Sequence, residues 1–115
     1  MYYLYYVIRV KHKSIIIMNI SELNLTELES KTLTAFTDCL YAEPGFSDVD
    51  VSDLSEVTGI STKSIRGALG SLVKKGVVTI NKNDGGYDII DLNVHYWHLV
   101  NESWAEEAEY ILKNN

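Results

Sequence analysis

The stretch from Ser61 to Lys75, STKSIRGALGSLVKK, most constrains the fold because its apolar and basic residues separate at the period of an α-helix. Ser61 has the side-chain oxygen of an N-cap, and Gly76 stands where a left-handed residue usually ends a helix. One side of this helix holds Ile65, Ala68, Leu69, Leu72 and Val73, and the other holds Lys63, Arg66, Gly67, Gly70 and Lys74. We expect the first side to face the core and the second to face a partner.

The charge of the chain is unevenly distributed. The net charge is -6, which by itself argues against nucleic acid, because duplex affinity comes largely from neutralising phosphates. Between Val57 and Asn83, however, there is no Asp or Glu. This segment contains the basic residues Lys63, Arg66, Lys74, Lys75 and Lys82. The pattern predicts one basic patch on an acidic body.

The length and the single cysteine limit the class of protein. A chain of 115 residues has the length of one domain and can bury a core without disulfides. Cys39 has no intrachain disulfide partner, which favours a reducing cytoplasm, and we interpret it as a core thiol. No apolar run is long enough to span a bilayer, and residues 1–13 place their charges after the apolar stretch, the reverse of a secretory signal. We expect a cytoplasmic protein without a membrane segment.

Residues 1–20 are rich in β-formers and predict a strand or an extended arm packed on the domain or on a second copy. Met18 offers an alternative start, because a complete domain begins with Met18-Asn19-Ile20-Ser21. Peptides upstream of Met18 in the mass spectrum of the native protein would exclude that alternative. We therefore divide the chain into an arm at 1–20, a domain at 21–92 and a C-terminal helix at 93–115.

Two helices are expected before the basic one. Thr26 and Glu29 have the spacing of a capping box, and an apolar stripe follows until Pro44-Gly45 ends the element. Residues 46–51 alternate apolar and polar and predict a short strand. Ser52 is expected to cap a brief helix over residues 53–58, with Leu54 and Val57 pointing inward. Gly59, Ile60 and Ser61 would then form a sharp turn into the basic helix.

After Gly76 the period changes to two. Residues 77–80 and 87–90 predict strands, and the intervening Asn81-Lys82-Asn83-Asp84-Gly85-Gly86 is a strong hairpin signal. The segment from Leu92 to Asn115 is expected to be helical, with Ser103 and Glu106 as a second capping box and a possible break near Asn101. Its aromatic residues Tyr96, Trp97 and Trp104 are expected in the core or in a dimer interface.

No catalytic or cofactor site is expected. The sequence lacks a Gly-rich phosphate loop, a nucleophile elbow and an HExxH motif. A continuous helix would align Asp91, His95, His98 and Glu102, but structural zinc sites usually include cysteine, so we prefer surface residues to a metal site. A small metalloprotein therefore stays the least favoured class.

The order helix, short strand, short helix, Gly turn, basic helix and hairpin resembles a winged helix-turn-helix domain. The likeness is carried by Val51 to Ile90 and is similar to the MarR-like group of regulators, whose recognition helix ends in Leu-x-x-Lys-Gly-x-Val. Here that ending stands as Leu72-Val73-Lys74-Lys75-Gly76-Val77. The resemblance implies an α+β fold: a three-helix core with a two-stranded β-wing, extended by the C-terminal helix and the N-terminal arm.

The resemblance also implies how the chain would bind DNA. In such families the second helix of the motif enters the major groove and the wing tip contacts the backbone or the minor groove. An Arg66 fork suits guanine, whereas lysines are better read as phosphate contacts. The implied DNA-binding residues are Ser61, Thr62, Lys63, Arg66, Lys74, Lys75, Lys82 and Asn83.

We therefore expect a regulator of transcription that binds double-stranded DNA, as a homodimer formed through the N-terminal arm and the C-terminal helix. The alternative is a winged-helix protein-interaction module, either an adaptor or an inhibitor whose acidic surface imitates DNA, because a fold does not fix a function.

Overall fold

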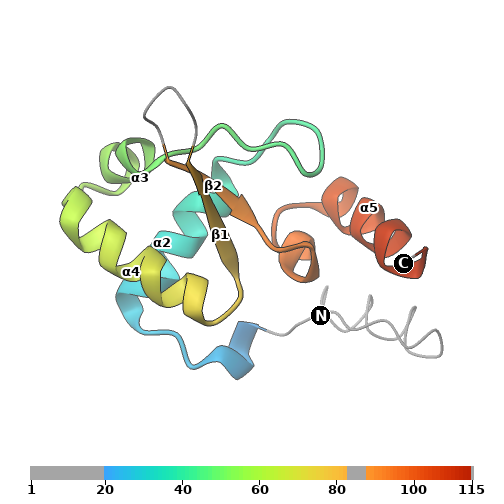
Figure 1. Cartoon of the computed structure of the whole chain (residues 1–115), viewed down its shortest axis with the longest axis horizontal. Coiled ribbons are helices and arrows are strands. Elements are labelled where there is room, and N and C mark those ends of the chain that lie inside the picture. Colours follow the sequence, from blue (N-terminus) through green and yellow to red (C-terminus); the bar gives the residue numbers. More distant parts are fainter. Residues whose placement is uncertain (1–19, 83–87, 115) are drawn as a thin grey trace.

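The computed structural model describes residues 20–82 and 88–114, and the expected N-terminal arm lies outside them. The described part has an α+β fold of helices and one small antiparallel sheet (Figure 1). The elements in chain order are the 3-10 helix η2 (Ile20–Leu23), α2 (Glu27–Asp38), α3 (Val51–Thr58), α4 (Thr62–Lys74), β1 (Val78–Lys82), β2 (Asp88–Leu92), the 3-10 helix η3 (Val94–Leu99) and α5 (Glu102–Lys113).

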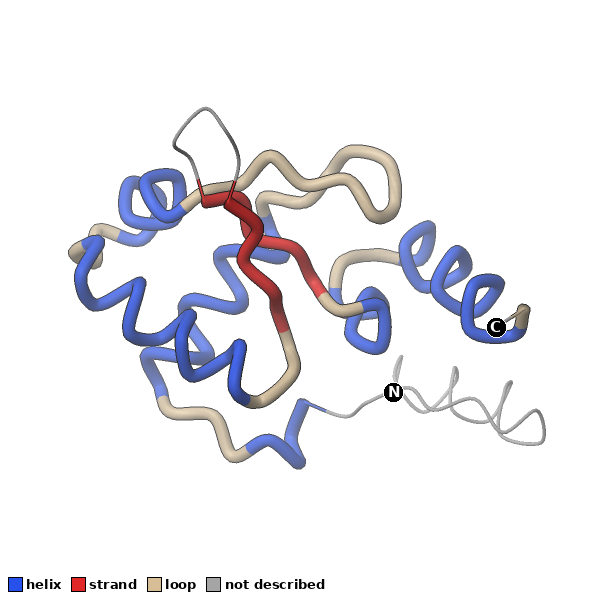
Figure 2. The backbone as a smooth tube through the Cα atoms, in the orientation of Figure 1, coloured by secondary structure: helices blue, strands red, loops and turns tan. Residues whose placement is uncertain are grey.

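The core lies where α2, α3 and α4 pack against one another and against the hairpin. Phe36 of α2, Leu54 of α3 and Leu69 of α4 are completely buried there. In Figure 2, α3 and α4 lie on one side of the hairpin, and η3 and α5 lie on the other. The basic helix is therefore held on three sides by other elements, which fixes the direction of its remaining face.

Side-chain caps determine where α2 and α3 begin. Thr26 and Glu29 form the expected capping box of α2, each side chain accepting a hydrogen bond from the other residue's backbone N–H. The expected cap of α3 at Ser52 was wrong. Asp50 is the N-cap and forms a reciprocal box with Asp53, at 3.0 and 2.9 Å. The helix consequently begins at Val51, two residues before the expected start.

The hairpin follows the expected change of period, with strand bounds shifted toward the C-terminus. Ile80 of β1 pairs with Ile90 of β2 at the centre of the register. The strand expected at residues 46–51 was wrong, although the segment is extended beside β2: the Ile90 N–H donates to the Val49 carbonyl at 2.9 Å. The Ser47 hydroxyl donates to the Ile90 carbonyl at 2.6 Å. A side-chain hydrogen bond thus stands where a second backbone hydrogen bond would form if residues 46–51 were a strand paired with β2.

The C-terminal segment is divided near Asn101, as the sequence predicted, into η3 and α5. Asn101 caps α5 by accepting from the Trp104 N–H at 3.0 Å, so the expected capping box of Ser103 and Glu106 was wrong. Trp97 and Trp104 meet edge to face at a centroid distance of 5.1 Å. The Trp104 indole N–H also donates to the Ala42 carbonyl at 3.2 Å. These contacts place the aromatic residues in the packing of one chain, as the core alternative predicted.

Candidate nucleic-acid interface

The outward side of α4 is basic and exposed. The buried side is formed by Ile65, Ala68, Leu69 and Leu72, as the periodicity predicted. Val73 was expected among them, but it is 39% exposed and lies at the edge of the outward side. The exposed residues on or next to the outward side are Ser61, Thr62, Lys63, Arg66, Gly67, Gly70 and Lys74.

A short, rigid turn joins α3 to α4. Gly59 caps α3 in the left-handed region at φ 76°, a conformation that glycine adopts without steric cost. The Ser55 hydroxyl donates to the Ile60 carbonyl at 2.6 Å, and the Thr58 hydroxyl accepts from the Ile60 N–H at 3.1 Å. Ser61 then caps α4 by accepting from the Ser64 N–H at 3.2 Å. The N-terminus of α4 is therefore held in one orientation relative to α3.

The two glycines of α4 are not required by packing inside the described structure. A Cβ atom built on Gly67 or Gly70 meets nothing within 4 Å, and neither residue has a positive φ. A glycine inside a helix costs about 1 kcal/mol relative to alanine. The fold is thus weakened at two exposed positions beside Arg66 without any gain in packing. Their smooth surface suits close approach by a partner.

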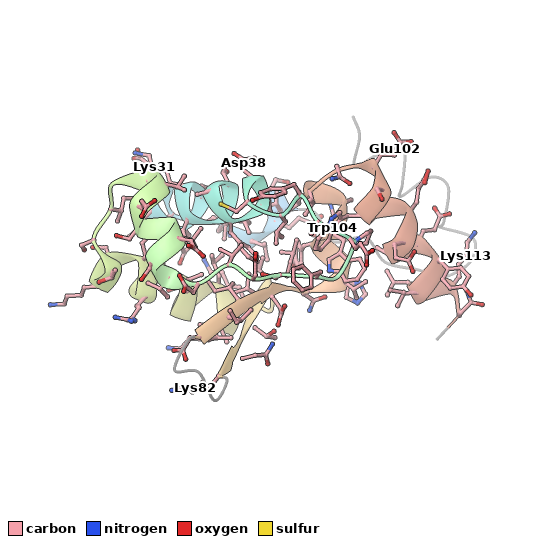
Figure 3. The ribbon with its side chains drawn as sticks, turned by 90° about the horizontal axis from the view of Figure 1, so that it is seen from above. Lys31, Asp38, Lys82, Glu102, Trp104 and Lys113 are labelled. Atoms are coloured by element: carbon pink, nitrogen blue, oxygen red, sulfur yellow. The ribbon has the colours of Figure 1, made fainter. Side chains whose placement is uncertain are left out.

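Lys82 lies at the end of β1, at the edge of the molecule opposite Lys31 and Asp38 of α2 (Figure 3). The other exposed residues of β1, Thr79 and Asn81, are uncharged. Asp91 pairs across from Thr79, and the Asn81 amide donates to its carboxylate. That carboxylate would repel phosphate from this face of the hairpin. Lys82, which pairs across from Asp88, is the basic residue at the described end of β1. Asn83, the other expected wing residue, lies outside the described residues.

Lys75 differs from the other basic residues. Its ammonium lies 2.8 Å from Glu29 Oε1 and 3.4 Å from the Asn24 carbonyl oxygen. The Lys75 side chain is half-buried, and the Glu29 side chain is buried, with 7% of its surface exposed. The hydrogen bond from Lys75, followed by that from the Thr26 N–H, holds the pKa of Glu29 below its usual value. The structure thus places Lys75 in an internal ion pair, away from the outward side of α4.

Other candidate sites are not assembled. The continuous helix that would align Asp91, His95, His98 and Glu102 does not exist, since these residues belong to β2, η3 and α5. Within residues 20–82 and 88–114, no group of three or more His, Cys, Asp or Glu side chains could hold a metal ion. Cys39 packs partly buried against the core, and burial raises the pKa of its thiol. That environment favours the core thiol that the sequence predicted over a nucleophile.

Sequence reasoning missed an exposed apolar surface on the other side of the domain. Val57 was expected to point inward, but it is 63% exposed, and Tyr41 is 86% exposed. The i and i+3 spacing of Leu54 and Val57 gave the wrong signal, because α3 presents a narrow buried stripe of Val51 and Leu54 only.

Comparison with protein-family models, with curated proteins and with solved structures found no match to this chain. None of the helices in the described part of the chain is long and apolar enough to cross a membrane.

Proposed function

We propose that the chain is a winged helix-turn-helix protein of the MarR-like kind that binds duplex DNA and regulates transcription. The fold assignment rests on the order and packing of the elements. Helices α2, α3 and α4 make mutual contacts, α3 and α4 are joined by a three-residue turn, and the hairpin follows α4 directly. In this proposal α4 is the recognition helix and β1 with β2 is the wing.

The observation that carries the proposal is the exposed side of α4. It combines Lys63, Arg66 and Lys74 with two glycines and has no acidic residue, in a chain whose net charge is -6. Concentrating positive charge on one helix supports attraction of phosphates there, while the acidic remainder opposes non-specific binding elsewhere.

The residues take different parts in the proposed complex. Arg66 would contact a guanine through its two-pronged guanidinium, and Lys63 and Lys74 would contact phosphates. Lys82 would bind the backbone from the wing tip. Ser61 serves as the N-cap of α4. Lys75 is assigned to its ion pair with Glu29 and not to a contact with DNA.

A homodimer would place two copies of α4 in successive major grooves. Half-sites about one helical turn apart would then form a two-fold symmetric operator. The segments available for dimerisation in this proposal are residues 1–20 and α5. A bound dimer would cover its two half-sites and either block or recruit RNA polymerase at the promoter.

Selection from a random duplex pool at moderate salt tests the proposal. We expect the retained sequences to share a two-fold symmetric site. If a folded preparation retains no sequence preferentially, the alternative of a protein-interaction module or DNA mimic is favoured. A protein partner would then be expected to bind the acidic surface.

Two substitutions then separate the parts of the interface. We expect Arg66→Ala to relax preference at one base pair of each half-site by about 1–3 kcal/mol, and Lys82→Ala to weaken all sequences alike and lower the salt slope by about one. Lys31→Ala removes an equal charge from the opposite edge of the molecule and serves as the control. Equal effects of all three variants would argue against α4 and the hairpin as the contact surface.

A further inference from the structure

Two shallow hollows adjoin on the side of the domain formed by α2 and α3. The first, of about 530 Å³, lies between α2 and the turn after α3 and is lined partly by Thr34, Ala35 and Ile60. The second, of about 320 Å³, lies between α3 and the segment after α2 and includes Tyr41 and Val49. Val57 lines both, so the hollows form one surface, which we call the α2–α3 groove.

The α2–α3 groove exposes apolar side chains that the fold leaves uncovered. Val57 is 63% exposed at its centre, and Tyr41 is 86% exposed at one end. A partner that covers Val57 removes apolar surface from water and gains binding energy from it. The groove therefore has an exposed apolar residue at its centre, in keeping with the more apolar cores of protein interfaces.

Carboxylates surround this apolar centre. Asp48, Asp53 and Glu56 line the second hollow, and Asp38 lines the first. Cys39 also lines the second hollow, and after burial the charges of Asp53, Asp38 and Asp48 further raise the pKa of its thiol. The negative potential of these groups thus converges on the groove. Lys31, at the other end of the first hollow, is paired with Glu27 at 3.2 Å.

We propose that the α2–α3 groove is a docking site for a basic segment of a partner protein, whose apolar residues cover Val57 while its arginine or lysine side chains reach Asp48 and Glu56. Long basic side chains suit this surface because their methylene stems pack on apolar residues while their charged ends stay hydrated or paired. Nucleic acid does not suit it, because phosphates would meet the carboxylates. The proposal goes beyond DNA binding and does not require it.

The α2 end of the groove lies away from Lys82, one of the proposed DNA contacts. Asp38 and Lys31 lie at the edge opposite Lys82 in Figure 3. A chain bound to DNA through α4 and the hairpin would still present the part of the groove lined by Asp38, Tyr41 and Asp48 to a second protein. This arrangement would let the protein connect a DNA site to a basic partner.

A titration of the full-length ¹⁵N-labelled protein with a model ligand tests the proposal. The probe is an acetylated and amidated helical peptide of Leu, Arg and Ala, with Leu and Arg on opposite edges of one face. We expect the resonance shifts to concentrate at residues 30–41 and 48–60. We expect Asp48→Asn combined with Glu56→Gln to raise the Kd about tenfold or more. Tyr41→Ser and Val57→Ser are expected to weaken binding as well.

The chain offers matched controls on α5. Glu106→Gln with Glu107→Gln makes the same charge change, and Tyr110→Ser removes a tyrosine that is 64% exposed. Both are expected to leave the Kd unchanged. Equal weakening by the two charge pairs would overturn the proposal, because the attraction would then be diffuse. Binding that survives replacement of every Leu in the probe by Ser would overturn it too, since the apolar centre would be unused.

A last variant tests whether the chain supplies its own occupant. Arg9, Lys11 and Lys13 belong to the N-terminal segment and have the charge that the groove would bind. If replacing all three by Ser strengthens peptide binding about tenfold or more, that segment competes for the groove and the proposal of a separate partner protein is wrong. An unchanged Kd supports the proposal.

Discussion

Lys74 and Lys75 are consecutive in the sequence, but their ammonium groups meet different surroundings. Lys74 ends α4 and is exposed, whereas Lys75 donates to Glu29 Oε1 at 2.8 Å and joins the end of α4 to the start of α2. Glu29 accepts at the same oxygen from the Thr26 N–H, so the carboxylate serves both the cap of α2 and the ion pair. A removal of Lys75 would therefore act on the fold rather than on an external ligand.

The two lysines provide a matched pair of substitutions. If the chain binds DNA through α4 as proposed, we expect Lys74→Ala to lower the salt slope of binding by about one, because each phosphate contact releases about one counterion. Lys75→Ala is expected to leave that slope unchanged, to lower the midpoint of thermal unfolding, and to raise the pKa of Glu29 toward its usual value. Binding isotherms at several salt concentrations and a carboxyl titration by NMR measure these quantities. Equal changes in slope would contradict the internal role of Lys75.

Gly67 and Gly70 allow stability and binding to be separated. We expect Gly67→Ala and Gly70→Ala each to raise the free energy of unfolding by about 1 kcal/mol, since alanine favours the helix and the added Cβ meets no atom within 4 Å. If DNA lies against this side of α4, each substitution is expected to weaken its binding about tenfold. Denaturant titration and binding measurements on the same preparations give both quantities.

The control for the glycine variants is Ser30→Ala, on the exposed side of α2. It is expected to change helix stability slightly and leave DNA affinity unchanged. An increase in both stability and DNA affinity in the glycine variants would show that no partner approaches α4 closely.

At the scale of elements, the sequence predicted the helices and the hairpin better than their starting points. Ser52 and Asp50 are both good capping residues, and the structure selects Asp50 because the acid three residues later, Asp53, can accept from its backbone N–H. The corresponding residue after Ser52 is Ser55, whose hydroxyl donates to the Ile60 carbonyl instead. Which of two nearby caps is used thus depends on contacts of the following turn, which the local pattern does not contain.

The choice of cap is itself testable. We expect Asp50→Ala to lower the free energy of unfolding by about 1 kcal/mol, the usual effect of removing an N-cap. Ser52→Ala, at the cap expected from the sequence, is expected to change it by less than about 0.5 kcal/mol, as for an ordinary surface substitution. Urea unfolding followed by far-UV circular dichroism compares the two. A larger effect at Ser52 would place the start of α3 two residues later.

At the scale of the whole molecule, what the sequence could not predict is long-range. The ion pair of Lys75 with Glu29 joins residues 46 apart, and the hydrogen bonds of Ser47 with Ile90 and of Trp104 with Ala42 join residues 43 and 62 apart. Periodicity and capping signals act over a few residues, so they predict which helix faces are apolar but not which side chains meet. The basic side of α4 was predictable for that reason, whereas the pairing of Lys75 and the exposure of Val57 were not.

His98 links the packing of the C-terminal segment to the stability of the whole fold. It lies in η3, is 4% exposed, and burial lowers its pKa from 6.5 to about 4. Between these two values the unfolded chain binds a proton at His98 and the folded chain does not. The contribution of His98 to the free energy of unfolding is therefore fully present above pH 6.5 and is lost as the pH decreases toward 4.

We expect the complete loss to be about 3–4 kcal/mol, from 1.36 kcal/mol per pKa unit over the interval between 6.5 and about 4. The variant His98→Gln has no proton to gain, so its stability is expected to vary less with pH between 6.5 and 4.5. Above pH 5.5 the pH is at least one unit above the usual pKa of Glu, 4.5, so a loss of stability in that range comes from His98 rather than from Glu29. Urea unfolding at half-unit pH intervals measures both curves, which should run parallel above pH 7. An equally steep loss in the variant would assign the acid sensitivity to other groups. A flat wild-type curve would show that burial does not lower the pKa of His98 in the folded protein.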